Sequence, residues 1–265
     1  MIKLGVNSVL FKEFSFAEAA RAIALAGYDG IEISAIKGMS EHLDLDNYAA
    51  QKDELISVIK ENGLEFLSTE VATLDRDRLQ KAFEACAAIG IPVVNVGPGG
   101  KSDEPGSLEA CIETLNDRAE LAAKYGVTLC CKAHVGGAIY STPTTLKAMA
   151  GVKSPFFGID MDPSHIWRAM ESPAAALPPV LSRVKHIHIR DCKGPGPSPG
   201  EPAMQTCGRG DIDLWGYFKA MVDGGYDGPV CLEVIGPGQT MVAASIIAAE
   251  SYGYMNAILK ALGAS

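Results

Sequence analysis

The stretch Val184-Lys185-His186-Ile187-His188-Ile189-Arg190-Asp191 shows the pattern on which the fold assignment depends. Polar and aliphatic side chains alternate along it, which is the period of an extended strand. The two isoleucines suit an apolar layer between a sheet and its covering helices. The opposite face, which carries His186, His188 and Arg190, is therefore expected to point into the interior of a barrel.

Seven other short runs resemble this stretch and alternate with amphipathic helical patterns. The eight predicted strands are 2–7, 30–34, 65–70, 92–96, 127–134, 156–161, 184–190 and 230–234. The predicted helices are 16–26, 45–61, 76–89, 108–124, 144–149, 174–181, 214–223 and 241–262. Eight unbroken strand–helix units predict an α/β protein with a single (β/α)8 TIM barrel over residues 1–265. An open doubly wound sheet is the alternative, but it usually carries glycines in its first turn, and residues 7–11 contain none.

Composition narrows the possible partners. Hydrophobic residues make up 48% of the chain and charged residues 21%, which is ordinary for a globular protein. A net charge of −9 argues against nucleic acid and anionic membranes, because both select basic patches. No apolar run approaches the ~18 residues of a membrane span, and the N-terminus lacks a signal-peptide pattern. Seven cysteines without a CxxC pair fit reduced thiols, so a cytoplasmic protein is expected.

Polar residues gather where the predicted strands end, which is where the active sites of such barrels lie. Four of the five histidines belong to this set, and histidines that converge with carboxylates are what a divalent metal requires. The set consists of Glu32, Glu70, Asn95, Lys132, His134, Asp160, Asp162, His165, His186, His188, Arg190 and Glu233.

Members of this set carry different expectations. His186 lies deeper in its strand and is expected to be structural, and Glu32 and Glu70 are expected to form ion pairs at the barrel rim. Asp160 is expected to face the helices, which makes Asp162 the better ligand.

Two further features are singled out by their chemistry. A lysine inside a barrel is costly unless it is paired, so Lys132 is either a member of an ion pair or a functional group. The long segment 191–210 contains Gly194-Pro195-Gly196-Pro197-Ser198-Pro199-Gly200 and follows strand seven, so we expect an active-site lid.

Four motifs resemble the xylose isomerase-like barrels of the sugar phosphate isomerase/epimerase superfamily. This group includes tagatose and psicose 3-epimerases, hydroxypyruvate isomerases, inosose dehydratases and endonuclease IV. The resemblance covers essentially the whole chain. It is strongest in 158–165 (GIDMDPSH), 184–191 (VKHIHIRD), 208–213 (GRGDID) and 225–233 (GYDGPVCLE).

The resemblance implies one divalent metal (Mn, Mg, Co or Zn), held by Asp162, His188 and Glu233. It also implies substrate contacts from His165 and His134. A fourth ligand, a glutamate on strand five, is replaced in this chain by Lys132. A protonated lysine cannot bind a metal and repels it.

Three outcomes remain open at this position. In the first, a metal binds with three protein ligands and water. In the second, the ammonium of Lys132 replaces the metal by pairing with Asp162 and Glu233. In the third, Lys132 has a depressed pKa and acts as a base or forms a Schiff base.

The leading interpretation is an isomerase or epimerase type of enzyme that shifts a proton next to the carbonyl of a small sugar or keto acid through an enediolate. Glu233 would be the base, Asp162 and His188 would hold the metal, and His134, His165 and Arg190 would hold the substrate. Because the two-base epimerases of the family use both strand-end glutamates, Lys132 favours an isomerase or dehydratase over a 3-epimerase.

Other classes of function stay open. One is a Lys132-dependent lyase, dehydratase or aldolase, and another is a non-catalytic sugar-binding homologue that has lost its metal site. A DNA-repair endonuclease is disfavoured by the negative charge. The resemblance also suggests a homodimer or homotetramer.

Overall fold

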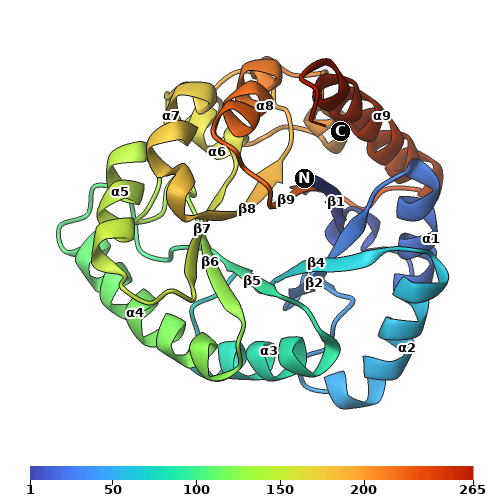
Figure 1. Cartoon of the computed structure of the whole chain (residues 1–265), viewed down its shortest axis with the longest axis horizontal. Coiled ribbons are helices and arrows are strands. Elements are labelled where there is room, and N and C mark those ends of the chain that lie inside the picture. Colours follow the sequence, from blue (N-terminus) through green and yellow to red (C-terminus); the bar gives the residue numbers. More distant parts are fainter. Residues whose placement is uncertain (265) are drawn as a thin grey trace.

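The protein is a closed ring of parallel strands surrounded by helices, as Figure 1 shows for a computed structural model that describes residues 1–264. Eight strands follow one another in the order β1-β9-β8-β7-β6-β5-β4-β2, and β1 also pairs with β2. The pairings Gly5↔Gly30 and Gly5↔Cys231 join the first strand to both of its neighbours, so the sheet has no open edge. The predicted TIM barrel is therefore confirmed.

The barrel strands are β1 (Lys3–Asn7), β2 (Gly30–Ile36), β4 (Glu65–Glu70), β5 (Val93–Val96), β6 (Thr128–Lys132), β7 (Phe157–Met161), β8 (Val184–Ile189) and β9 (Pro229–Leu232). A two-residue strand, β3 (Ser40–Glu41), pairs antiparallel with the end of β2. The helices are α1 (Phe16–Ala26), α2 (Tyr48–Glu61), α3 (Arg76–Ile89), α4 (Ser107–Lys124), α5 (Thr142–Gly151), α6 (Pro163–Arg168), α7 (Pro173–Val180), α8 (Leu214–Asp223) and α9 (Met241–Ala261).

Local sequence explains where the elements begin and end. Helix α1 starts with a capping box in which Ser15 and Glu18 satisfy each other's backbone N–H groups. It ends at Gly27, whose φ of 101° lies in the left-handed region that glycine adopts without steric cost. Helix α6 was not predicted, because its six residues are too few to show a helical period. It begins at Asp162, which caps it, and has Pro163 in its first turn.

Strand β8 has the two faces predicted from its alternation. Ile187 and Ile189 are fully buried in the apolar core, while His186 and His188 bind polar partners from other barrel strands. The carboxyl ends of the strands therefore bring polar side chains together inside the barrel. Within residues 1–264, no helix combines the length and the apolar character that a membrane span requires.

Candidate active site

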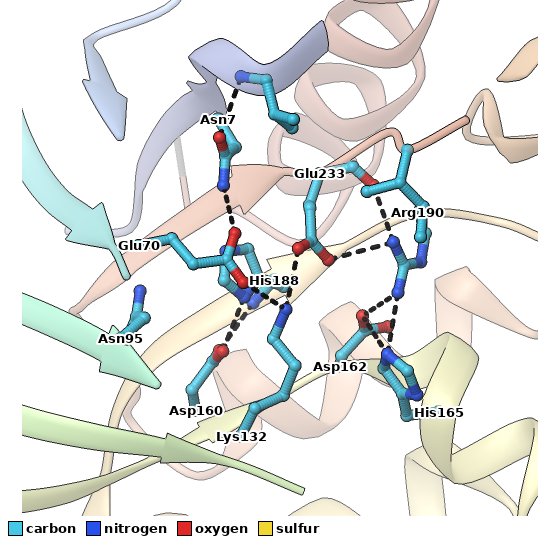
Figure 2. Close-up of polar contacts among 12 residues, drawn as sticks. Asn7, Glu70, Asn95, Lys132, Asp160, Asp162, His165, His188, Arg190 and Glu233 are labelled. Carbon is cyan, nitrogen blue, oxygen red and sulfur yellow. Dashed lines mark hydrogen bonds and ion pairs between the residues drawn. The ribbon is translucent and has the colours of Figure 1, made fainter. Parts of the chain in front are cut away.

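Three buried side chains, two at the ends of β4 and β6 and one directly after β9, form the centre of the site (Figure 2). The Nζ of Lys132 lies 2.8 Å from Glu233 Oε1 and 3.2 Å from Glu70 Oε1. Each of the three residues is 3–5% exposed, so the charges are almost fully removed from water. We call Glu70, Lys132 and Glu233 the lysine cluster. Lys132 is thus a member of an ion pair, as one of the sequence-based alternatives held, but its second partner is Glu70 rather than Asp162.

Arg190 extends this cluster across the barrel. Its Nε donates to Ser164 Oγ at 2.7 Å, and its Nη2 lies 2.9 Å from both Asp162 Oδ2 and His165 Nε2. Its Nη1 lies 3.0 Å from Glu233 Oε2 and 3.4 Å from the Glu233 carbonyl oxygen. The Oε2 contact is an ion pair without hydrogen-bond geometry. Four hydrogen bonds and one ion pair therefore hold the guanidinium, which makes Arg190 a clamp between strands.

The two carboxyl groups of the lysine cluster have pKa values shifted in opposite directions. Burial alone would raise the pKa of Glu233, but Lys132 and Arg190 outweigh it and hold that pKa well below its usual range. Burial and the charge of Glu233 raise the pKa of Glu70 to about 8. Burial would lower the pKa of Lys132, but both glutamates outweigh it and keep the amine charged. At neutral pH the cluster thus holds an ionised carboxylate, an ammonium and a largely protonated carboxyl group.

A second set of buried side chains, Glu32, Asp160, His186 and His188, forms what we call the histidine cluster. Asp160 Oδ1 accepts from the His188 backbone N–H at 3.0 Å and lies 3.1 Å from His186 Nδ1, and its Oδ2 binds His188 Nδ1. The other nitrogen of His188 binds Glu32. Burial would lower the pKa of His188, but these two carboxylates raise it well above its ordinary value.

The prediction that Asp160 faces the helices is wrong. Residues two apart on an extended chain share a face, so Asp160 and Asp162 both point inward. Asp160 is also in register with Lys132 on the neighbouring strand and is fully buried. His186, predicted to be structural, is fully buried between Asp160 and Ser68.

Asn7 was not among the predicted site residues, yet it joins the two clusters. Its Nδ2 donates to Glu32 Oε2 at 2.9 Å and to Glu70 Oε2 at 2.7 Å, and its Oδ1 accepts from Val9 N–H. Asn95 donates to Glu32 Oε1 at 2.6 Å. A polar residue at the end of the first strand was the available signal, because every other barrel strand carries one there.

The two predicted substrate-binding histidines lie together at the edge of the site. The rings of His134 and His165 are in contact, with centroids 3.9 Å apart and planes tilted by 35°. His165 is buried and His134 is exposed. Burial and the nearby cations lower the pKa of both imidazoles, so both are neutral near pH 7.

The side chains expected to hold a metal do not fit one at that place. Asp162 Oδ1 accepts from Ser164 and its Oδ2 pairs with Arg190, while Glu233 faces both Lys132 and Arg190. His188 is engaged at both nitrogens. A divalent ion would therefore have to displace two cations from the carboxylates that it needs.

Other combinations of ligand atoms do lie close together. Among residues 1–264, three groups place their ligand atoms within 4.8 Å of one another: Glu32–His186–Cys231, Asp160–His186–His188 and Glu32–Glu70–His188. None of these groups contains Asp162 or Glu233.

The segment predicted to be a lid is anchored mainly at its base. The Asp191 carboxylate accepts from the N–H groups of Cys192, Gly208 and Ile212. Nearer the tip, Arg168 binds the carbonyl oxygens of Gly196 and Pro197. Closure over the site stays a prediction.

A closed parallel barrel with charged side chains at its strand ends defines the TIM-barrel class. Within that class, the chain belongs to the xylose isomerase-like TIM barrel family, whose family model matches residues 20–255. This confirms the resemblance drawn from the sequence motifs.

The similar proteins are enzymes. The chain is 24% identical to an inosose dehydratase of Clostridium perfringens, over 88% of this chain and 89% of that one. It is 23% identical to a 3-dehydroshikimate dehydratase of Pseudomonas putida, over 83% of this chain and 36% of the other. A D-allulose 3-epimerase from Methylomonas has the same fold, with a TM-score of 0.76, 16% identity and coverage of 97% and 98%. The chain is thus a sugar isomerase/epimerase-like enzyme, in a group that includes dehydratases.

Proposed function

We propose that the protein removes a proton next to the carbonyl group of a small sugar or keto acid and then eliminates water or shifts the proton, with dehydration favoured. The observation that carries this proposal is the position of the Lys132 ammonium between the carboxyl groups of Glu233 and Glu70. Inosose and 3-dehydroshikimate, for which two relatives are named, are small hydroxylated ketones, and this supports the substrate class.

Glu233 would remove the proton. Its carboxylate is ionised at neutral pH, and Oε2 makes no hydrogen bond in the part of the chain that the structure describes. As the C–H bond breaks, its electron pair forms the enolate and negative charge develops on the carbonyl oxygen. Lys132 donates two of its three N–H groups to the carboxyl groups of Glu70 and Glu233, which leaves one to donate to that oxygen.

Glu70 would complete the reaction as the acid. A carboxyl group with a pKa of about 8 carries a proton at neutral pH and can give it to a departing hydroxyl group, which leaves as water. If the proton returns to the neighbouring carbon instead, the same groups catalyse isomerisation. The separated pKa values of Glu70 and Glu233 favour this division into acid and base.

The ion pairs argue against an imine mechanism. A lysine attacks a carbonyl only as the neutral amine, and Glu233, with a smaller part from Glu70, keeps Lys132 charged. Borohydride added with substrate should therefore leave no adduct on Lys132. A mass increase on the peptide that contains Lys132 would favour the lyase or aldolase alternative.

Metal dependence gives the sharpest test. We expect turnover of an inosose or 3-dehydroshikimate to persist in EDTA, because Lys132 supplies the positive charge. Lys132→Glu should bind Mn2+ at least about tenfold more tightly than the parent, since it removes a repelling charge and adds an anionic ligand. Calorimetric titration measures this, with the exposed Lys219→Glu as the matched control. Loss of turnover in EDTA with recovery in Mn2+ would contradict the proposal.

A further inference from the structure

Three neighbouring strands, β4, β5 and β6, carry a polar residue near the carboxyl end. Glu70, Asn95 and Lys132 point into the site, as Figure 2 shows, and two positions later come Ala72, Gly97 and His134. These three later residues follow the carboxyl ends of β4, β5 and β6, which form the mouth of the barrel.

The same three residues line one cavity of about 450 Å3. Glycines supply much of the remaining wall, among them Gly99, Gly100 and Gly136. Ala72 has a φ of 55°, a left-handed conformation that costs a non-glycine residue energy and that gathers at functional sites. The cavity thus lies next to the strand ends that carry Glu70, Asn95 and Lys132, and it is large enough for a small ligand.

Gly97 stands out among these glycines because neither conformation nor packing requires it. Gly99 and Gly100 have φ values of 61° and 59°, which restrict substitution. Gly97 has no positive φ, and a Cβ atom built on it meets nothing within 4 Å. A side chain at this position would extend into open space, so the absence of one keeps the cavity free.

The lining also restricts the charge of a ligand. None of the nine lining residues is Lys, Arg, Asp or Glu, and burial together with Lys132 lowers the pKa of His134, which keeps its ring neutral near pH 7. The adjacent cavity on the other side of Ala72 is lined by Lys37, Asp75 and Arg78. Backbone amides and one neutral imidazole suit hydroxyl groups, whereas a phosphate would find no cation.

We propose that this cavity binds the neutral, hydroxylated part of an unphosphorylated substrate, and that Gly97 sets the size that it admits. The inference rests on the proposed function, since it places the reacting carbonyl at Lys132 and the remaining carbons with their hydroxyl groups beyond it.

Non-reacting polyols test the cavity separately from the chemistry. Binding of myo-inositol, D-mannitol and myo-inositol 1-phosphate would be measured by NMR titration against the parent, Gly97→Ala and Gly97→Leu. Gly253→Ala is the matched control, because Gly253 lies in α9 and also meets nothing within 4 Å. We expect the parent to bind at least one polyol at millimolar concentration, Gly97→Ala to bind it about tenfold more weakly, and Gly97→Leu not to bind it. Gly253→Ala should match the parent.

Several results would overturn the inference. The first is that the parent binds neither polyol, and the second is that Gly97→Ala binds a polyol as tightly as the parent does. The third is that myo-inositol 1-phosphate binds tenfold more tightly than myo-inositol. If Gly97→Leu does not fold, the Gly97→Ala titration decides alone. A parent that binds a polyol in this cavity but turns over no hydroxylated ketone would sink the proposed function and leave the cavity assignment intact.

Discussion

The lysine cluster and the histidine cluster contain similar chemical groups but differ in access and in hydrogen bonding. Every member of the histidine cluster is fully buried, and both nitrogens of each imidazole have partners. The members of the lysine cluster keep 3–5% exposure, and Glu233 Oε2 lacks a hydrogen bond. Buried charge by itself therefore does not identify the reactive groups. The distinguishing features are an open hydrogen-bonding position on Glu233 and the small residual exposure of the lysine cluster.

This contrast assigns different tasks to the two clusters. The histidine cluster ties β2, β7 and β8 together through charge-assisted hydrogen bonds, which are stronger than neutral ones. In the proposed reaction, the lysine cluster supplies the acid, the cation and the base. Substitutions in the first should mainly change stability, and substitutions in the second should mainly change turnover.

Glu233→Gln should have the largest effect, because it removes the only carboxylate of the lysine cluster that is ionised at neutral pH. We expect kcat to fall about 1000-fold while the circular dichroism spectrum stays unchanged. Glu32→Gln is the matched control in the histidine cluster and should keep kcat within about threefold. Equal losses in the two variants would break the division between the clusters.

Glu70→Gln should reduce kcat about 100-fold and change its dependence on pH. The pKa of Glu70 is raised to about 8, so the acid form prevails below this pH and is lost as the pH rises through it. Wild-type activity should therefore decline above about pH 8, and the variant should lack this decline. Glu65→Gln, on the exposed part of the same strand, should leave kcat and its pH profile unchanged. A variant that keeps the alkaline decline would remove Glu70 from the acid role.

The barrel and several of its inward-facing residues could be predicted because they follow from local periodicity. Alternation along 184–190 correctly assigned the polar face of β8, and one of the three alternatives left open for Lys132 paired it with Glu233. Capping signals at Ser15 and Gly27 gave the bounds of α1. Each of these features depends on residues close together in the sequence.

The pairing of charges across the barrel could not be predicted in the same way. Glu70 and Lys132 are 62 positions apart, and Asn7 and Glu70 are 63 apart. Which side chains meet depends on the tilt and stagger of the strands, which only the closed sheet defines. For this reason Glu70 was expected at the rim, and Asp162 was expected to be a free ligand although Ser164 and Arg190 occupy its oxygens.

Asp160→Asn tests the structural half of the comparison and should lower the free energy of unfolding by about 3 kcal/mol. At about pH 6 the wild-type carboxylate is ionised, since its pKa is held well below the usual range, and His188 is protonated, since its pKa is raised. The substitution leaves two buried imidazoles without their shared anion. Urea denaturation measures the change, and kcat of the folded variant should stay within about fivefold of wild type. A fall in kcat without a loss of stability would assign Asp160 to the chemistry.

Arg168→Ala should have the smallest effect and addresses how the mouth of the barrel is held. Arg168 binds the carbonyl oxygens of Gly196 and Pro197, in the Gly- and Pro-rich tip of the segment 191–210, whereas Asp191 holds the base of that segment. Without Arg168 the tip should be cleaved several times faster by subtilisin and should order less readily over a ligand, so KM should rise about threefold with kcat unchanged. Myo-inositol should slow cleavage of the wild type if the tip closes over the Gly97 cavity. Lys219→Ala, which removes only an exposed ion pair with Asp223, should change neither the rate of subtilisin cleavage nor KM. If subtilisin cleaves Arg168→Ala no faster than wild type, contacts other than those of Arg168 hold the tip of the segment 191–210.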